Sequence, residues 1–496
     1  MLIATLPVTD YSSTKQKLFQ ISDRADGIEL RLDYLSHWDI DEVTALRQAC
    51  VLPVIFTLRS RAHGGHYPHP ETQRIQEIMG LCALNPDYLD VEYDVPVQHI
   101  QAIRRRYPAI KVILSYHNFE ETPADLQALF QSIYQPDCYA YKIATHAQSS
   151  LDALRMLQCV LTLRPRHRMV GLCMGEAGQC TRILGSVVGS IFSYAYWDPE
   201  QETAPGQLSL QDLTAIYHYR QLNPATKVYA LLGDPVHLSV GHLLHNRAMA
   251  LLQQNAVYVK LRVTSEDLPQ ALQLLRELPC WGLSITMPLK EAILPCLDEI
   301  DPETQVIQAV NTVLRRQQRL IGLNTDGVGA IQALSSYGAL AGQTLILIGA
   351  GGAARAIAYV ALRHQAKVII LNRTLARAQR LATELGCEAQ ALPALHALTG
   401  YTLCVNTLPE QAYQDPDMQA LWQSRPLLPN VLAMDIVYQP IETTFLRLVK
   451  AAGWRGIPGY EMFIAQALLQ IQHWFQPEDQ QLEKIKASMQ SHFSQS

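Results

Sequence analysis

The feature that most constrains this chain is a repeated alternation of short apolar strands and amphipathic helices through its first half. The spacing of apolar residues predicts helices at 40–50, 71–84 and 149–163. Runs of β-branched or aromatic residues predict eight strands, at 2–6, 27–32, 51–58, 88–93, 111–116, 138–143, 169–174 and 186–197. This alternation is typical of a (β/α)8 TIM barrel, whose active site lies at the carboxyl ends of the strands. We therefore predict an α/β protein in which residues 1–222 form such a barrel.

Polar residues lie at or near the ends of these predicted strands, where a barrel enzyme carries its chemistry. They are Glu29, Arg31, Arg59, Glu92, His117, Lys142 and Arg182. Each alone is compatible with an ordinary surface position, but seven at one rim indicate a site. The arginines favour an anionic substrate.

Lys142 is the most informative of these residues because its predicted strand is otherwise apolar. An ammonium group in a buried strand has a large desolvation cost, which favours the neutral amine. A neutral amine attacks ketones and forms a Schiff base that withdraws electrons from the neighbouring carbon. His117, on the adjacent strand, is the natural proton carrier because histidine titrates near neutral pH. These residues predict a Schiff-base lyase or aldolase acting on a small keto acid.

The barrel motifs resemble, in their order along the chain, those of type I 3-dehydroquinate dehydratases. The motifs are ELRLD at 29–33, TLRS at 57–60, DVE at 90–92, SYHNF at 115–119, YKIA at 141–144, MG at 174–175, TR at 181–182 and APGQ at 204–207. The resemblance implies that Lys142 forms an imine with the C3 ketone. It also implies that His117 removes the C2 proton and later protonates the departing C1 hydroxyl. The implied substrate-binding residues are Glu29, Arg31, Arg59, Arg182, Thr203 and Gln207.

Two positions depart from the family pattern. His63 stands where the family usually has glutamate, and Thr203 stands where it usually has serine. The first change replaces an anion near His117 by an imidazole ring, whereas the second keeps the hydroxyl group.

A glycine-rich turn after an apolar strand at 345–348 predicts a nucleotide site in the second half. Glycines let a phosphate approach the backbone, and the first amides of the following helix are free donors at the positive end of its dipole. Arg373 follows Gly351 by 22 residues, and a cation there suits the 2′-phosphate of NADP. We therefore predict an NADP-binding Rossmann domain at 331–455. Its predicted cofactor-binding residues are Gly349, Ala350, Gly351, Gly352, Ala353, Asn372, Arg373 and Thr374.

Between these two parts, a linker at 223–227 leads into a predicted α/β substrate domain at 228–330. The sequence predicts a helix at 239–254 and strands at 257–263, 282–286, 312–314 and 320–323. C-terminal helices at about 456–480 are expected to complete this domain. From here to about residue 475 the chain resembles shikimate dehydrogenase. The motifs are GDPV at 233–236, SITMPLK at 284–290, AVNT at 309–312, NTDG at 324–327, the glycine turn with NRT at 372–374, VNT at 405–407, DIVYQP at 435–440 and GYEM at 459–462.

The second resemblance implies a catalytic dyad of Lys290 and Asp326. Lys290 is expected to polarise the C3 carbonyl of 3-dehydroshikimate and supply the proton while NADPH delivers hydride. Asp326 is expected to hold the ammonium group and the C4 hydroxyl. The implied substrate pocket also contains Ser239, Thr286, Asn311, Tyr438 and Gln466. The family's Ser-x-Ser pair for the substrate carboxylate aligns with Ser239 and Gly241, so one serine is missing.

Composition limits the possible partners and compartment. A net charge of −5 without a Lys/Arg run argues against nucleic acid or an anionic membrane surface as a partner. The ten cysteines are scattered without a Cys-x-x-Cys pair, which predicts reduced core residues and no metal site. We find no signal peptide and no apolar run of membrane-spanning length, so we expect a cytoplasmic protein. The sequence leaves the oligomeric state open, a monomer included.

Together the two resemblances predict a bifunctional enzyme of the shikimate pathway, a 3-dehydroquinate dehydratase joined to an NADP-dependent shikimate dehydrogenase. Two alternatives remain at this point. One is a Schiff-base aldolase fused to another NADP reductase, including a quinate dehydrogenase. The other is a ligand-sensing regulator without activity, against which the four catalytic residues and the lack of a DNA-binding motif argue.

Overall fold

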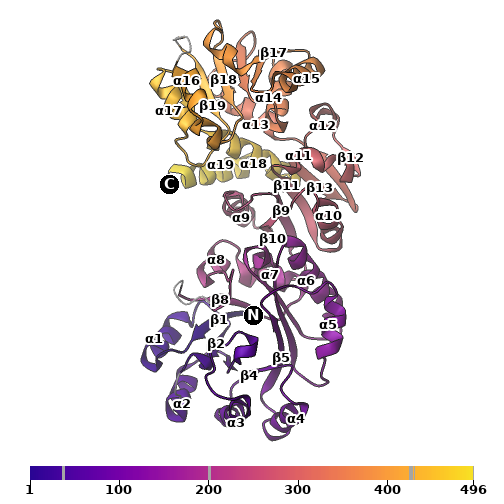
Figure 1. Ribbon diagram of the computed structural model, residues 1–496, viewed down its shortest axis with the longest axis vertical. Helices are drawn as coiled ribbons and strands as arrows, with labels where there is room; N and C mark the ends of the chain where they lie inside the picture. Colours follow the sequence, from indigo (N-terminus) through magenta and orange to yellow (C-terminus); the bar gives the residue numbers. More distant parts are fainter. Residues whose placement is uncertain (36–38, 199–202, 424–427, 429, 495–496) are drawn as a thin grey trace. The chain divides into compact units, whose positions relative to one another are not determined.

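The computed structural model describes residues 1–35, 39–198, 203–423, 428 and 430–494 (Figure 1). It divides into two compact units. The first comprises Met1–Ala230 and Asn255–Cys280, and the second comprises Leu231–Gln254 and Trp281–Ser496. No helix within the described ranges is long and apolar enough to span a membrane.

Eight parallel strands form the sheet of the first unit, in the order β7-β6-β5-β4-β3-β2-β1-β8. The strands are β1 Leu2–Pro7, β2 Gly27–Arg31, β3 Val54–Thr57, β4 Tyr88–Glu92, β5 Lys111–Asn118, β6 Ala140–His146, β7 Met169–Met174 and β8 Ser193–Tyr196. The helices around them are α1 Tyr11–Ile21, α2 Ile40–Ala49, α3 Glu71–Leu81, α4 Val97–Arg106, α5 Leu126–Ile133, α6 Ser150–Leu163, α7 Gln179–Val188 and α8 Leu210–Ala215 (Figure 1). The predicted TIM barrel is confirmed.

The eighth strand differs from its prediction at 186–197. Residues 186–188 end helix α7, and the strand begins only at Ser193. Gly189 terminates the helix with a backbone φ of +91°, a left-handed conformation that glycine adopts without steric cost. A short apolar run suits a buried helix end as well as a strand, so its periodicity did not distinguish the two.

A second sheet of six strands has the order β10-β9-β11-β13-β14-β12. The strands are β9 Lys227–Gly233, β10 Ala256–Arg262, β11 Cys280–Ile285, β12 Glu299–Ile300, β13 Thr312–Arg316 and β14 Arg319–Leu323. The helices of this part and of the C-terminus are α9 Gly241–Leu251, α10 Leu268–Glu277, α11 Leu289–Ala292, α12 Pro302–Ile307, α13 Asp326–Ser335, α18 Gly459–Phe475 and α19 Asp479–Ser494. The strands predicted for this region lie within a few residues of those observed.

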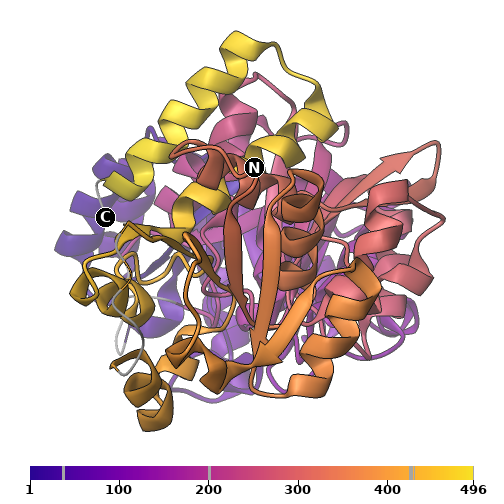
Figure 2. The same cartoon turned by 90° about the horizontal axis from the view of Figure 1, so that it is seen from above.

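The third sheet is parallel and has the Rossmann-like order β17-β16-β15-β18-β19-β20; its orange strands lie side by side in Figure 2. The strands are β15 Thr344–Ile348, β16 Lys367–Asn372, β17 Glu388–Ala391, β18 Leu403–Asn406, β19 Leu432–Asp435 and β20 Arg455–Ile457. Its helices are α14 Gly352–Arg363, α15 Leu375–Leu385, α16 Pro416–Gln423 and α17 Thr444–Ala451.

The sequence of strand β15 is a continuous apolar run because both faces of the strand are buried. Leu345 and Leu347 pack into one hydrophobic cluster, and Ile346 and Ile348 pack into another. Successive side chains of a strand point to opposite faces, so a strand covered on both faces has no polar positions. The carboxyl end of β15 therefore lies in the middle of a buried sheet, where the glycine turn begins.

Candidate active sites

One cavity of the first unit brings together all but one of the barrel residues that the sequence assigned to a site. Its lining includes Glu29, Arg31, Arg59, His117, Lys142, Arg182, Thr203 and Gln207. His63, Thr5 and Tyr194 also line it. Glu92, which was grouped with these residues from the sequence, is absent from this lining and binds Arg74 at 2.8 Å instead.

The ammonium group of Lys142 is buried but not isolated. Its Nζ lies 3.1 Å from Oδ2 of Asp90 and 3.8 Å from Oε1 of Glu29. It also lies 4.3 Å from the ring centroid of Tyr194, within the range of a cation–π contact. Burial alone therefore does not describe this lysine, because two carboxylates lie within 4 Å of its ammonium group. Asp90 was quoted only as part of a motif, although it shares a buried face with Glu29 and Lys142.

Lys142 belongs to a run of buried side chains with alternating charge, which we name the buried charge chain. Arg74 bonds Glu92, Glu92 lies 3.3 Å from Arg59, and Arg59 bonds Asp90 at 2.8 Å. The members are Arg74, Glu92, Arg59, Asp90, Lys142 and Glu29. Burial opposes ionisation of Asp90, but the cations Arg59 and Lys142 outweigh it and hold the pKa of Asp90 well below its usual value. Charges buried away from water persist because each has partners of opposite sign.

His117 lies on β5 beside this chain. Burial is the main cause that lowers the pKa of His117 well below the ordinary histidine value of 6.5, and the nearby cations Arg59 and Lys142 add to it. The ring stacks on Phe119 with a centroid distance of 6.5 Å. Gly64 makes room for the Phe119 ring, since a Cβ on Gly64 would lie 2.2 Å from that ring. A neutral, fixed imidazole in a cavity with a lysine is suited to accept a proton.

The remaining barrel residues are held by neighbours within the cavity wall. The Arg31 guanidinium bonds both carboxylate oxygens of Asp33, at 2.8 and 2.9 Å. Thr203 donates from its hydroxyl to Oε1 of Gln207 at 3.0 Å. Arg182 donates to the carbonyl oxygen of Tyr194. Each side chain thus has a fixed position before any substrate binds.

A second site forms in the second unit around Lys290 and Asp326. Lys290 Nζ lies 2.5 Å from Oδ2 of Asp326, and the amide of Asn311 donates to the other oxygen, Oδ1, at 2.8 Å. The same amide lies 3.3 Å from Oε1 of Gln466. Lys290 lies on α11, Asn311 immediately before β13, Asp326 at the start of α13 and Gln466 on α18. The predicted dyad is therefore a close pair whose carboxylate is oriented by a neutral amide.

Two further predicted substrate residues meet, Ser239 just before α9 and Tyr438 after β19. The Gly241 N–H donates to the hydroxyl of Ser239 at 3.1 Å. Burial raises the pKa of Tyr438, and a hydrogen bond with Ser239 partly opposes that shift. Thr286 follows β11 and packs against Gly233, where a Cβ would lie 2.2 Å from the threonine methyl group.

A buried polar network supports this site from behind. Gln470 on α18 accepts from the Ser284 hydroxyl and lies 3.1 Å from His245 Nε2. Its amide nitrogen donates to the Thr312 hydroxyl at 3.0 Å. Burial lowers the pKa of His245 to about 4, so this ring is neutral and acts as a hydrogen-bonding support. The sequence analysis missed both Gln470 and His245.

The glycine turn connects β15 to α14 as predicted. Gly349 has a φ of +110°, and a Cβ there would lie 2.2 Å from Oγ1 of Thr407, so no other residue fits. A Cβ on Gly352 would lie 3.8 Å from Cβ of Lys290, which places the turn beside the dyad. Gly351 has open space around it. The first amides of α14 therefore open onto a space next to Lys290.

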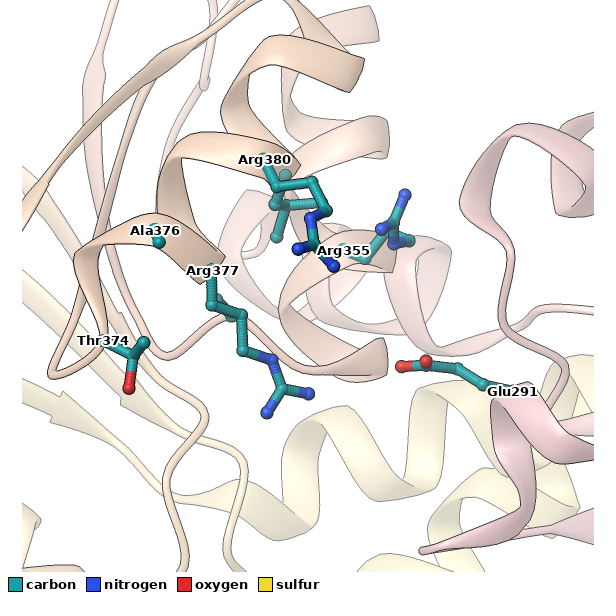
Figure 3. Close-up of a pocket in the computed structure, with 8 residues that line it drawn as sticks. Glu291, Arg355, Thr374, Ala376, Arg377 and Arg380 are labelled. Carbon is teal, nitrogen blue, oxygen red and sulfur yellow. The ribbon is translucent and has the colours of Figure 1, made fainter.

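A pocket beside this turn contains three arginines that the sequence analysis missed (Figure 3). Its lining residues are Glu291, Ala350, Arg355, Thr374, Ala376, Arg377, Arg380 and Leu381. Arg377 and Arg380 come from α15 and Arg355 from α14, where it forms an ion pair with Glu384. Arg373 is exposed and is absent from this lining, so its contact with a 2′-phosphate stays a prediction. Exposed arginines on a helix resemble an ordinary solvated face in sequence, which is why they were overlooked.

Comparisons with known proteins match the two sites in order along the chain. The family model for type I 3-dehydroquinase matches residues 2–224. The model for the shikimate dehydrogenase substrate binding domain matches 231–313, and that for shikimate/quinate 5-dehydrogenase matches 332–403. The chloroplastic bifunctional 3-dehydroquinate dehydratase/shikimate dehydrogenase of Arabidopsis thaliana is 36% identical over 472 residues, which cover 90% of this chain and 77% of that protein.

The chain belongs to this bifunctional family.

A bacterial relative of the same family, the shikimate biosynthesis protein AroDE of Chlamydia pneumoniae, is 34% identical and covers 96% of this chain and 95% of that protein. Among solved structures, a shikimate dehydrogenase crystallised with NADP+ aligns with a TM-score of 0.50 at 31% identity. It covers 55% of this chain and 97% of that chain. Membership of the bifunctional family favours the dehydratase and dehydrogenase pairing over the aldolase fusion left open by the sequence.

Proposed function

We propose that this chain dehydrates 3-dehydroquinate to 3-dehydroshikimate in the barrel and reduces that product to shikimate with NADPH in the second unit. One observation carries the proposal: a buried lysine with a neutral histidine lines one cavity, and a second lysine pairs with an aspartate beside a glycine turn.

We also propose the division into a barrel at 1–222, a linker at 223–227, a substrate domain at 228–330 completed by 456–480, and an NADP domain at 331–455. No disulfide joins any of the ten cysteines, all of which lie within the described ranges, and this suits the reducing cytoplasm.

In the barrel, Lys142 acts as the nucleophile. Its ammonium must lose a proton before attack, and the neutral His117 in the same cavity accepts this proton and gives it back to the hydroxyl that later leaves as water. The amine then adds to the C3 carbonyl of the substrate, and loss of water gives an iminium that draws electrons from C2. The neutral His117 removes the C2 proton, and the electron pair forms the C1–C2 double bond as the C1 hydroxyl leaves. His117 returns its proton to that hydroxyl, and water then releases the product from Lys142.

Charged and polar side chains of the cavity hold the substrate for these steps. Arg182 is placed to bind the carboxylate, because its guanidinium lines the cavity near Tyr194. Glu29, Arg59 and Gln207 line the same cavity and are placed to bind ring hydroxyls. Glu29 already accepts hydrogen bonds from Thr5 and Thr57, so its carboxylate is held in one orientation.

The second site fits an NADP cofactor. Gly349 and Gly351 leave the backbone open at the start of α14, and Arg355, Arg377 and Arg380 surround a neighbouring pocket with positive charge. Bound there, NADPH supplies the hydride for reduction of the C3 carbonyl. Lys290 polarises the carbonyl and donates the proton to its oxygen, while Asp326 holds the ammonium group. Asn311 fixes the aspartate through its second oxygen.

The test is to supply purified protein with 3-dehydroquinate and NADPH and to measure shikimate together with NADPH oxidation. We expect shikimate to form in proportion to the NADPH consumed. A parallel reaction that starts from 3-dehydroshikimate measures the second step alone. Failure of the full reaction with success of the second would disprove the dehydratase assignment, and failure of both would disprove the proposal.

A further inference from the structure

His63 occupies a place in the dehydratase cavity that the mechanism above does not use. It ends the short 3-10 helix Arg61–His63 after β3 and lines the cavity with Lys142 and His117. Its side chain is 8% exposed, and its Nε2 lies 3.0 Å from Oδ2 of Asp94. Asp94 follows β4, and its side chain is 51% exposed. The pair therefore connects the buried cavity to a carboxylate in contact with solvent.

The hydrogen bond to Asp94 determines which nitrogen of His63 faces the cavity as an acceptor. A carboxylate only accepts hydrogen bonds, so Nε2 of His63 must donate. In the neutral ring, Nδ1 then carries a lone pair and no proton. This Nδ1 is buried and has no hydrogen-bond partner among the residues that the structure describes. A buried acceptor without a partner needs one during the reaction cycle or is costly to keep.

The neighbouring ring of His117 lacks what His63 offers. Its Nδ1 is also buried without a partner within the described part of the chain. The ring centroids of His117 and His63 lie 6.1 Å apart with planes at 75°, so the edge of one ring faces the other. The charged groups that act on His117 most strongly are the cations Arg59 and Lys142. A proton taken by His117 would therefore enter a strongly positive surrounding.

We propose that Asp94 and His63 form a relay that orients His117 and stabilises its protonated form. His63 Nδ1 accepts a hydrogen bond from the N–H of His117, directly after a small ring rotation or through one water molecule. Asp94 fixes the tautomer of His63 and adds negative charge behind it. Both are positioning residues, since neither touches the substrate in this scheme. The inference rests on the proposed dehydratase activity.

The first experiment separates proton transfer from substrate binding by steady-state kinetics of dehydration in the full-length protein. We expect Asp94→Asn to lower kcat about tenfold or more, because the variant loses one charge-assisted hydrogen bond. KM should stay within about twofold of its original value. Asp94→Glu should restore most of kcat because it restores the carboxylate. Asp41→Asn, which changes an exposed carboxylate in the first turn of α2, is the matched control and should have no effect. A rise in KM at constant kcat for Asp94→Asn would overturn the relay.

The second experiment tests whether His63 and Asp94 act as one unit. His63→Glu places a carboxylate beside His117, so we expect Asp94→Asn to cause no further loss of kcat in that background. Equal losses in both backgrounds would overturn the inference. Borohydride trapping of the Lys142 adduct in every variant shows that the barrel is folded and that the first step is intact. Absence of dehydration and of the adduct in the unsubstituted protein would overturn the proposed function, and this inference with it.

Discussion

The two active sites each depend on a lysine, but they surround it differently. The Lys142 side chain is 7% exposed and lies within 4 Å of two carboxylates, those of Asp90 and Glu29. The Lys290 side chain is 22% exposed and has one carboxylate partner, Asp326. Lys142 must lose its proton to form a covalent bond, whereas Lys290 must keep a proton until it gives it to the carbonyl oxygen.

The difference extends to the neighbours of each carboxylate. Asp90 belongs to the buried charge chain and is bonded by the cation Arg59. Asp326 is oriented by the neutral amide of Asn311. A network of full charges holds the nucleophile in a fixed place away from water, and a network of neutral amides leaves the proton donor accessible to substrate and cofactor. The same residue type thus serves two reactions because its surroundings differ.

The largest effect is expected for removal of the nucleophile. Lys142→Ala should reduce dehydration on the order of 10⁴-fold or more, because the cavity lining contains no second lysine within the described part of the chain. Reduction of 3-dehydroshikimate should be unaffected. Borohydride added during turnover should label Lys142, as peptide mapping by mass would show. Dehydration that survives this substitution would rule out the Schiff-base mechanism.

Lys290→Ala tests the other lysine and should have the opposite pattern. Loss of the proton donor is expected to slow reduction on the order of 10²-fold or more while dehydration continues. Accumulated 3-dehydroshikimate would then be the product from 3-dehydroquinate. An equal loss of both activities would mean that the two lysines do not divide the chemistry as we propose.

The arginines of the cofactor pocket should affect only the second reaction. A charge-assisted contact with the 2′-phosphate contributes about 1.5–3 kcal/mol, so its loss should lower the preference for NADPH over NADH by roughly tenfold to 150-fold. Comparing Arg373→Ala with Arg377→Ala distinguishes the position predicted from sequence from the one that lines the pocket. An unchanged preference in both variants would place the phosphate elsewhere.

Gly241→Ser restores the hydroxyl that the dehydrogenase family usually has. One added hydrogen bond to the substrate carboxylate of about 1–2 kcal/mol should lower KM for shikimate about fivefold to 30-fold. Quinate has an additional hydroxyl on the carbon that carries the carboxylate, and the space at Gly241 is expected to admit it. Quinate oxidation by the unsubstituted protein should therefore be measurable and should fall in the variant. If neither acid responds, another residue binds the carboxylate.

The smallest expected effect is on the pH profile of dehydration. Burial, together with Arg59 and Lys142, lowers the pKa of His117, so the base stays neutral as the pH falls below 6.5. At about pH 6 an unshifted histidine would be only about one-quarter neutral, a roughly fourfold loss that we do not expect here. A profile of kcat/KM against pH should place the acidic limb below 6.5. A limb at or above that value would show that His117 is charged more easily than its surroundings indicate.

Much of the architecture followed from local patterns in the sequence. The alternation of strands and helices predicted the barrel, and the glycine turn predicted the strand-to-helix connection between Ile348 and Gly352, because both depend on residues adjacent in the chain. The predicted start of the eighth strand was wrong, because the apolar run at 186–188 ends helix α7 instead. A position at a strand end also did not reveal orientation: Glu92 pairs with Arg74, and Asp90 holds Lys142.

The features that sequence patterns missed all depend on residues far apart in the chain. Gln470 meets His245 and Ser284 only because α18 packs behind the substrate site. Arg355 and Arg380 become part of one pocket only when two helices lie beside the same turn. Single-sequence periodicity describes neighbours within one element, so contacts between elements need the folded structure.

The buried charge chain also restricts which substitutions the barrel sequence can accept during evolution. Removing one member takes an opposite charge away from its buried neighbours, and breaking a buried pair in this way typically costs about 3–5 kcal/mol, comparable with much of a domain's total stability. Arg59 has carboxylate partners on both sides, so neutral substitutions there are expected to be rarer than at Arg74, whose second partner, Glu71, is half exposed. Lineages that abandon dehydration should therefore lose these six residues in pairs rather than singly. An alignment of inactive relatives would show correlated replacement by apolar residues.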